Sequence, residues 1–341
     1  MRKSVLILYT GGTIGMKTNV LTGGLAPFNF EQIEEEVPEL KKFNLNIDTY
    51  TFDPLIDSSN VKPALWVELA EIIKGKYNQY DGFVVLHGTD TMAYSASALS
   101  FMLTNLSKPV VFTGSQIPIG VLRTDGKENL ISSIEIAAHE ATGAVKVPEV
   151  CVFFQNHLLR ANRTSKYSAE HFNAFRSDNY PSLATAGIKI DYNSPFINHN
   201  YKNDPLEIKT SMCEDVVVLD IFPGISQLVV SSILNMPNIK GVVMRTYGSG
   251  NAPTDEWFIE ELKSAIDRGV AILNVTQCCS GGVNMELYDT GKLLSEIGVI
   301  SGGDITTEAA IVKMMFLLGQ GVKGDDLYSK LAKSIRGEIS I

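Results

Sequence analysis

Two short turns near the start of the chain contain threonines that could do nucleophilic chemistry. The apolar run Val5–Tyr9 leads into Thr10-Gly11-Gly12-Thr13, and the apolar run Gly82–Leu86 leads into His87-Gly88-Thr89-Asp90. Ligands of open α/β sheets bind beyond the carboxyl ends of the strands, and glycine lets the backbone approach a ligand closely. Both turns therefore predict threonine hydroxyls at one edge of a sheet.

Two further predicted strand ends carry similar side chains. Asp57-Ser58-Ser59 follows the predicted strand Ile47–Phe52, and Ser115 follows the predicted strand Val110–Thr113. Each group alone is equally compatible with a turn or a helix cap. Four groups at one sheet edge favour a shared pocket for a small zwitterionic substrate. Attack by a threonine needs a base, and the candidate is a lysine held neutral by burial and hydrogen bonds.

The composition excludes several classes of protein. The chain has 341 residues, of which 45% are hydrophobic and 20% charged, as is ordinary for a globular protein with a sizeable core. A formal charge of −9 without a Lys/Arg cluster argues against nucleic-acid binding. The sequence has neither a membrane-spanning apolar stretch nor a signal-peptide cleavage site. We therefore expect a cytoplasmic protein with no nucleic-acid or membrane partner.

Cysteine and histidine spacing predicts no disulfide and no metal site. None of the four cysteines forms a Cys-x-x-Cys pair, adjacent Cys278 and Cys279 suit a disulfide poorly, and the five histidines lack metal-ligand spacing. We expect Cys278 and Cys279 to be small buried residues, because nothing nearby supplies an electropositive setting. His87 is expected to be a packed residue at a strand end rather than a base.

Apolar runs alternate with helical patterns along the chain. Strands are expected at 5–9, 47–52, 82–86, 110–113, 150–154, 216–221, 241–245 and 270–275. Helices are expected at 30–41, 62–77, 92–106, 127–140, 227–235, 255–267, 305–318 and 325–335. This alternation predicts an α/β fold with mostly parallel sheets flanked by helices.

The apolar period disappears between Tyr192 and Ser211, where Asn, Pro and Lys cluster. We therefore predict a larger N-terminal catalytic α/β domain over 1–191, a linker over 192–211, and a smaller C-terminal α/β domain with a parallel sheet over 212–341. Within the first domain, Lys17–Pro27 is rich in Gly, Thr and Asn and is expected to form a mobile loop or hairpin.

These motifs resemble the bacterial-type L-asparaginases, above all their type I, cytosolic branch. The similar stretches cover nearly the whole chain and are Tyr9–Met16, Asp57–Ser59, His87–Met92, Phe112–Gln116, Asn162–Lys166, Tyr247–Pro253 and Thr276–Cys278. Both threonine motifs at this spacing form a highly specific combination. The resemblance implies hydrolysis of L-asparagine to L-aspartate and ammonia without a cofactor or metal.

The resemblance also implies catalytic roles. Thr13 would be the nucleophile that forms an acyl-enzyme, while Thr89, Asp90 and Lys166 would relay protons and activate water. Asp90 would in addition hold the substrate α-amino group as its counter-ion. Without the resemblance, Lys166 would be assigned to a solvated loop, because it follows the polar run Asn-Arg-Thr-Ser.

Substrate binding would involve further residues. By the same resemblance, Asp57, Ser58 and Ser59 would bind the α-carboxylate and α-amino ends, and Ser115 would contact the departing amide through its backbone carbonyl. One feature departs from the family. Many relatives have a tyrosine on the mobile loop after the nucleophile, whereas Lys17–Pro27 contains none and Leu25 fills that place. Either another group does that work, or this branch dispenses with it.

In the second domain the resemblance implies regulation and assembly. Some type I enzymes bind asparagine at a separate regulatory site between domains, and Arg245, Asn251 and Cys278 lie in matching stretches, so allosteric activation is an expectation. Relatives form homodimers or homotetramers, which we expect here as well. The ratio of asparagine to glutamine turnover stays open, because one methylene is typically worth only about 1–3 kcal/mol. Weak glutaminase activity is compatible with the sequence.

Two alternatives remain open. The amidase subunit of a tRNA-dependent amidotransferase looks similar around the threonine motifs but carries an additional N-terminal domain, for which a first strand at residue 4 would leave no room. A non-catalytic amino-acid or nucleotide sensor is the second alternative. A dinucleotide site would show Gly-x-Gly-x-x-Gly, and Gly11, Gly12 and Gly15 have a different spacing.

Overall fold

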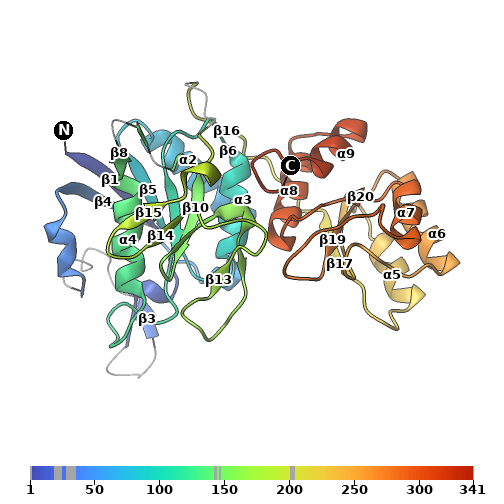
Figure 1. Cartoon of the computed structure of the whole chain (residues 1–341), viewed down its shortest axis with the longest axis horizontal. Helices are drawn as coiled ribbons and strands as arrows, with labels where there is room; N and C mark the ends of the chain where they lie inside the picture. Colours follow the sequence, from blue (N-terminus) through green and yellow to red (C-terminus); the bar gives the residue numbers. More distant parts are fainter. Residues whose placement is uncertain are drawn as a thin grey trace. The chain divides into compact units, whose positions relative to one another are not determined.

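An eight-stranded, mostly parallel sheet forms the centre of the first of two units, Met1–Lys209 and Thr210–Ile341 (Figure 1). The computed structural model describes residues 2–18, 25–27, 36–141, 144–145, 147–199 and 204–340. Most of the stretch expected to be a linker belongs to the first unit. It contains the short helix η6 (Ser194–Phe196) and strand β16 (Glu207–Ile208), which pairs with β6 (Leu103–Thr104).

The strand order of this sheet is β15-β14-β11-β10-β7-β5-β1-β4. The strands are β1 (Lys3–Tyr9), β4 (Leu45–Thr51), β5 (Gly82–Leu86), β7 (Val110–Thr113), β10 (Val150–Phe154), β11 (His157–Arg160), β14 (Ala184–Ala186) and β15 (Ile190–Tyr192). Strands β4, β1, β5, β7 and β10 run parallel, which confirms the predicted fold class. The remaining three strands add antiparallel pairs that the sequence analysis missed.

The switch from parallel to antiparallel pairing occurs at a two-residue hairpin. Strand β10 returns as β11 through Gln155 and Asn156, whose φ values are 45° and 70°. Positive φ at both central residues is the geometry that matches the twist of a tight hairpin. Asparagine tolerates this conformation but glutamine rarely adopts it, so the sequence contained only half of the usual hairpin signal.

Helices cover both faces of the first sheet. Helix α4 (Gly126–Ala138) packs on β1, β5, β7 and β10, and its buried face joins a core cluster with Val5, Ile7 and other alternate strand residues. Helix α3 (Met92–Met102) contacts β7 and β10 and packs against α2 (Pro63–Lys76), on the other side of the sheet from α4 (Figure 1). Helix α3 is buried almost all round and ends four residues before the predicted boundary, because the chain continues into β6.

The segment after the first turn is a hairpin where it is described. Strand β2 (Met16–Thr18) pairs antiparallel with β3 (Leu25–Pro27), and the residues between them lie outside the described ones. The first half of the helix expected at 30–41, residues 30–35, lies outside the described residues as well. Its described end is the 3-10 helix η3 (Pro38–Lys42), which has a proline at its first position, where the missing N–H costs no hydrogen bond.

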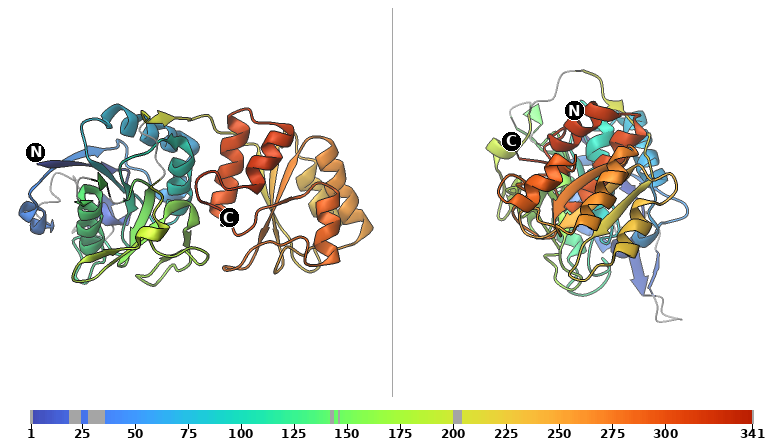
Figure 2. Two further views of the ribbon diagram at one scale, coloured as in Figure 1. Left: turned by 45° about the horizontal axis from the view of Figure 1, so that its top comes forward. Right: turned by 90° about the vertical axis from the view of Figure 1, so that its right-hand side faces the viewer.

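The second unit is built on a four-stranded parallel sheet. Its strands, in sheet order, are β17 (Val216–Asp220), β18 (Gly241–Thr246), β19 (Ala271–Thr276) and β20 (Ile300–Ser301). Figure 2 shows helices on both sides of this sheet, namely α5 (Gln227–Leu234), α6 (Glu256–Asp267), α7 (Asp289–Glu296), α8 (Thr307–Gly319) and α9 (Gly324–Ala332). Helix α7 and strand β20 were not predicted, because α7 buries only Gly291 and Leu294 and β20 is two residues long.

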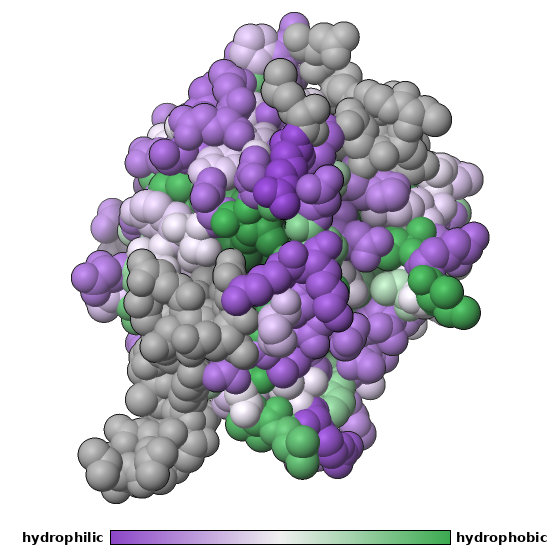
Figure 3. Space-filling model, turned by 90° about the vertical axis from the view of Figure 1, so that its left-hand side faces the viewer, coloured by the Kyte–Doolittle hydropathy of each residue, from purple (hydrophilic) through white to green (hydrophobic). Residues whose placement is uncertain are grey.

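Strand β4 is the outer edge of the first sheet, and its exposed side chains are polar apart from Tyr50. Asn46, Asp48 and Thr49 are exposed there, and Tyr80 donates a hydrogen bond to Asp48. The face of the molecule in Figure 3 is correspondingly hydrophilic over most of its area. Charged and polar side chains on an edge strand discourage pairing with another chain. No helix among the described residues is long and apolar enough to cross a membrane.

Candidate active site

A cavity of about 260 Å³ lies where the parallel strands of the first unit end. The turns after β1, β4, β5 and β7 all reach it, together with strand β12 (Ser165–Lys166) and the loop that follows. Its lining residues are Gly12, Thr13, Met16, Asp57, Ser58, Gly88, Thr89, Asp90, Gln116, Lys166 and Ala169. The four residues predicted to be catalytic therefore face one space, although they are up to 153 positions apart (166 − 13) in the sequence.

Backbone contact between two glycines brings the threonine turns together. Gly12 has a φ of 90°, and a Cβ added there would lie 2.5 Å from the Cα of Gly88. Any side chain at Gly12 would push the β1 and β5 turns apart. Glycine is thus required both for its conformation and for the close approach that lets Thr13 and Thr89 line one cavity.

The two threonines of the first turn have different surroundings. Thr10 is buried, and its hydroxyl donates to the carbonyl of Leu86 at 2.9 Å, so Thr10 ties β1 to β5 outside the cavity lining. Thr13 begins the 3-10 helix η1 (Thr13–Gly15) and lines the cavity. Tyr9, at the end of β1, holds this turn in place, because its hydroxyl donates to the carbonyl of Gly15 at 3.1 Å. Burial raises the pKa of Tyr9, which keeps its phenol protonated as a donor.

Lys166 connects the two groups of the second threonine turn. Its Nζ donates to the Thr89 hydroxyl at 2.8 Å and to Asp90 Oδ1 at 2.7 Å. The Lys166 side chain is 17% exposed, whereas that of Asp90 is 64% exposed. Both contacts use the lysine as a donor, and the second is an ion pair with a carboxylate.

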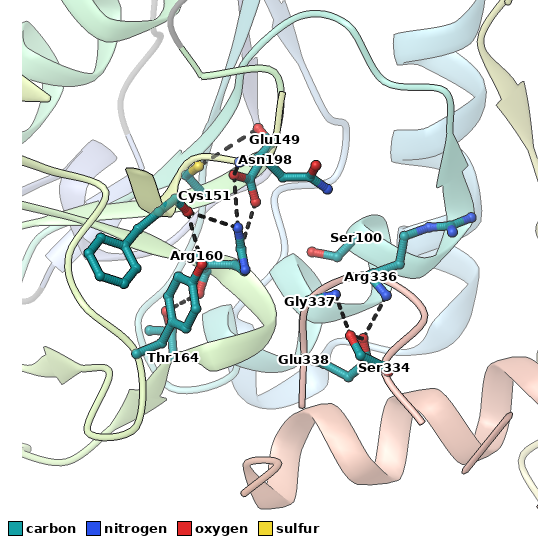
Figure 4. A network of polar contacts seen from close by, with 12 residues as sticks. Ser100, Glu149, Cys151, Arg160, Thr164, Asn198, Ser334, Arg336, Gly337 and Glu338 are labelled. Atoms are coloured by element: carbon teal, nitrogen blue, oxygen red, sulfur yellow. Dashed lines mark hydrogen bonds and ion pairs between the residues drawn. The ribbon is translucent and has the colours of Figure 1, made fainter. Parts of the chain in front are cut away.

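A buried ion pair holds the segment that carries Lys166 (Figure 4). Arg160, at the end of β11, binds the Glu149 carboxylate through Nε at 2.7 Å and Nη2 at 3.1 Å. The Thr164 hydroxyl donates back to the carbonyl of Arg160 at 2.7 Å. The turn between Arg160 and Lys166 is therefore fixed at its start, and the two-residue strand β12 pairs with β13 (Phe175–Arg176) at its end.

Asp57, Ser58 and Ser59, in the turn that follows β4, have different surroundings. Asp57 and Ser58 line the cavity, and Ser59 does not. Ser59 instead donates two hydrogen bonds of 2.9 Å to Asp57 Oδ1, from its backbone N–H and from its hydroxyl. These bonds lower the pKa of Asp57, so its carboxylate stays ionised at the rim. The geometry makes Ser59 a support for Asp57 rather than part of the described lining.

His87 is buried and forms part of a directed chain of hydrogen bonds. The Trp66 indole donates to Ser95 Oγ at 2.9 Å, and Ser95 Oγ lies 2.9 Å from His87 Nε2. The carbonyl oxygen of Gly88, 2.7 Å from Nδ1, can only accept, so Nδ1 carries the proton of the neutral ring and Nε2 accepts from the Ser95 hydroxyl. Burial lowers the pKa of His87 to about 4, so the ring is neutral at pH 7. The expectation of a packed strand-end histidine is confirmed.

Gln116, which the sequence analysis passed over in favour of its neighbour, lines the cavity. Ser115 is buried and is absent from the lining, and its Oγ has no hydrogen-bond partner among the described residues. Gln116 contacts the Thr89 hydroxyl at 3.2 Å. A glutamine after Gly-Ser offers no chemical signal in the sequence, because its contacts depend on a loop more than fifty positions away.

The candidate regulatory residues lie near the ends of two strands of the second sheet: Arg245 is in β18, Asn251 follows β18, and Cys278 follows β19. Arg245 pairs with Asp220 at 2.7 Å, while its buried Nε has no partner among the described residues. Asn251 accepts a hydrogen bond from Thr290 at 2.6 Å. Cys278 and Cys279 are exposed, contrary to the expectation that they are buried, because they follow β19 in an open loop rather than lying in the strand.

The described residues contain no group of three His, Cys, Asp or Glu side chains that could hold a metal ion. All four cysteines are free thiols, and Cys151 and Cys213 are the buried ones. The side chains that line the cavity include hydroxyl, carboxylate, amide and amine groups.

Comparison with known families assigns both units. The family model described as "Asparaginase, N-terminal" matches residues 4–198, and the model described as "Glutaminase/Asparaginase C-terminal domain" matches residues 215–329. The chain is 43% identical to L-asparaginase 1 of Escherichia coli strain K12, over 99% of this chain and 98% of that protein. It is also 41% identical to the 60 kDa lysophospholipase of Mus musculus, over 99% of this chain and 63% of that protein.

A solved structure agrees with these matches. The crystal structure of L-asparaginase I from Vibrio cholerae aligns with a TM-score of 0.91 and 40% sequence identity, covering all of both chains. Both sheets and the turns at their strand ends therefore have counterparts in that protein.

Proposed function

Because this chain belongs to the asparaginase family of amidohydrolases, we propose that it hydrolyses L-asparagine to L-aspartate and ammonia, with Thr13 as the nucleophile. The observation that carries this proposal is the convergence of Thr13 with Thr89, Asp90 and Lys166 on one cavity of about 260 Å³. The described lining is mostly polar, with Met16 and Ala169 as its apolar side chains, and it suits a small amide better than a fatty acyl chain.

The two carboxylates of the lining provide recognition of the substrate α-amino group. Asp57 is kept ionised by Ser59, and Asp90 is exposed beside Lys166. The Ser58 hydroxyl is the candidate donor to the α-carboxylate. When these residues hold the α-amino and α-carboxylate groups of the substrate, its side-chain amide is directed toward Thr13.

The reaction then proceeds in two balanced steps. The Thr13 oxygen attacks the amide carbon, the carbon–nitrogen bond breaks, and the hydroxyl proton leaves with the nitrogen as ammonia. Water next attacks the acyl carbon, the bond to Thr13 breaks, and a water proton returns to the Thr13 oxygen. Thr89 and Lys166 lie where they can relay these protons, and no further reactant is needed.

Substrate binding changes the partners of Lys166 in this scheme. In the free site, Lys166 donates to Thr89 and pairs with Asp90. A substrate ammonium group at Asp90 competes for the same carboxylate oxygens. Lys166 is then shifted toward the Thr89 hydroxyl and the reacting atoms, so that occupancy of the amino-acid subsite and proton relay are linked.

The test is ammonia release from purified protein and its Thr13→Val variant. L-Asparagine is the expected substrate, with L-glutamine slower by about 10–200-fold because one methylene misplaces the amide. Thr13→Val is expected to lower kcat by at least about 10³-fold while the melting temperature stays nearly unchanged. Thr185→Val, which makes the same change at an exposed position of β14, is the matched control.

Several outcomes would contradict the proposal. Near-normal turnover by Thr13→Val would remove the nucleophile assigned here. Calorimetric binding of asparagine without hydrolysis would favour a sensor. Release of fatty acid from a lysophospholipid, with no ammonia from asparagine, would favour the activity for which the mouse relative is named.

Regulation and assembly are part of the proposal. The buried Nε of Arg245, which lacks a partner among the described residues, supports a ligand site at the strand ends of the second unit. Asn251 follows the same strand, β18, and Cys278 follows its neighbour, β19. Asparagine binding there would give a sigmoidal rate curve that becomes hyperbolic in Arg245→Ala.

A homodimer or homotetramer is expected, and light scattering of the purified protein measures its molar mass and so distinguishes the two.

A further inference from the structure

We infer that Gln116 is a positioning residue that sets the direction of the hydrogen bonds of Thr89 and thereby the proton relay. This inference rests on the proposed function. Gln116 follows β7, next to the β5 turn that carries Thr89, and it lines the same cavity. Its side-chain amide lies between the Thr89 hydroxyl and the loop that follows Lys166.

The contacts of Gln116 fix which way its amide points. Nε2 donates to the carbonyl of Ala169 at 3.2 Å and to that of His171 at 3.3 Å, so both amide protons have acceptors. If the amide were turned over, its oxygen would face two carbonyl oxygens. Oε1 therefore faces the Thr89 hydroxyl, at 3.2 Å.

This orientation determines where the Thr89 proton lies. Oε1 can only accept, so the single hydroxyl proton of Thr89 is donated to Gln116. Lys166 Nζ then donates to Thr89 Oγ1 at 2.8 Å. The Thr89 oxygen keeps one further lone pair, which is available to the cavity. Through this lone pair Thr89 accepts a hydrogen bond from the attacking water and orients it, while the water proton passes to the departing Thr13 oxygen.

The same side chain joins two parts of the cavity wall. The loop after Lys166 closes on itself, because Tyr167 N–H donates to the carbonyl of Ala174 at 2.8 Å and His171 N–H donates to Ser168 Oγ at 2.9 Å. Gln116 attaches this closed loop to the strand ends of the sheet. Its loss would therefore release both the Thr89 hydroxyl and the wall at Ala169.

The backbone of Gln116 is anchored independently of its side chain. Asp125 accepts hydrogen bonds from Gln116 N–H at 3.0 and 3.1 Å and from Ile117 N–H at 3.1 Å. Asn129 donates to the carbonyl of Gly114 at 3.0 Å. Side-chain substitutions at 116 should therefore leave the turn in place, so the relay can be tested in a folded protein.

The test measures how the acyl-enzyme partitions between water and hydroxylamine. Hydroxylamine is the stronger nucleophile and depends less on a base, so weaker water activation raises the ratio of hydroxamate to aspartate. Gln116→Met is expected to lower kcat by about 10–100-fold, to change KM less than about threefold, and to raise this ratio at least about fivefold. Gln116→Glu keeps an acceptor for Thr89 but turns an oxygen toward the carbonyls of Ala169 and His171, so it is expected to restore this ratio only in part. Gln79→Met, at an exposed site of the same unit, is the control.

The outcomes separate this inference from the proposed function. An unchanged ratio in Gln116→Met would overturn the positioning role while asparagine turnover by the unmodified protein stands. Absence of both products from the unmodified protein would contradict the proposed function itself and this inference with it. Equal losses of aspartate and hydroxamate would show a structural effect only and would also overturn the relay role.

Discussion

Each unit contains a lysine–carboxylate pair of nearly the same length, yet the two pairs have different surroundings. Lys166 and Asp90 lie 2.7 Å apart at the cavity of the first unit, with side chains 17% and 64% exposed. Lys313, on α8, lies 2.6 Å from Glu338 in the second unit, and both side chains are fully buried. Distance alone therefore does not distinguish a reactive pair from a structural one.

The partners of the two lysines explain the difference. Lys313 also donates to the carbonyls of Leu331 and Lys333, so its three protons are all used within the protein. Glu338 accepts backbone bonds from Ile335 and Arg336 in a tight turn (Figure 4). Lys166 instead has one hydroxyl and one exposed carboxylate as partners. A buried, saturated pair stabilises one conformation, whereas a half-open pair can exchange partners with a substrate.

The largest expected effect comes from removing the charge of Lys166. Lys166→Met should lower kcat for asparagine by about 10²–10⁴-fold, because the Thr89 hydroxyl loses its donor and the relay is broken. The free energy of unfolding should change by less than about 1 kcal/mol, because the carboxylate left behind is exposed to water. Steady-state kinetics and urea unfolding measure the two quantities. A kcat within threefold of normal would contradict the assignment.

The same substitution in the buried pair should have the opposite effect. Lys313→Met leaves Glu338 as a buried anion with no counter-ion and removes the donor to two carbonyls, which should cost about 3–5 kcal/mol of stability. The kcat per folded molecule should stay close to normal, because Lys313 does not line the cavity. Urea unfolding and active-site titration separate the two effects. Loss of less than about 1 kcal/mol would show that the pair is not a stabilising element.

The elements that the sequence predicted well are those that local pattern determines. Strands β1, β5 and β10 are buried on both faces, so they read as continuous apolar runs and were placed within two residues. Strands β14 and β15 are only three residues long, and β14 is held in the sheet by pairing with β11. The alternation of apolar and polar residues over so short a stretch does not predict a strand.

The residues of the candidate site also differ in whether local sequence or distant contacts determine their place. Thr13 and Thr89 were found because glycine turns after apolar runs are local, and the family motifs named their neighbours. Gln116 was missed because its bonds reach residues more than fifty positions away, and the support that Ser59 gives to Asp57 was not predicted. Lys313 interrupts an apolar helix, and only its contact with Glu338, 25 positions later (338 − 313), explains that charge.

The smallest expected effect concerns the neutral histidine beneath Thr89. The pKa of His87 is about 4 in the folded protein against 6.5 for an ordinary histidine. Between these values the unfolded chain binds a proton that the folded chain excludes, so stability is lost as the pH falls through this window. From pH 7 to pH 4.5 the loss due to His87 should be about 2–3 kcal/mol.

His87→Asn should remove this part of the pH dependence, because asparagine does not titrate and can still donate to the carbonyl of Gly88. Urea unfolding over this pH range gives the slope, and His199→Asn, at an exposed position, is the matched control. An unchanged slope in His87→Asn would mean that the folded protein accommodates the charged ring. In that case the hydrogen bonds from Trp66 through Ser95 would not hold His87 in its neutral form. The contrast between buried polar groups, which keep one set of partners, and the partly exposed groups of the cavity would then weaken.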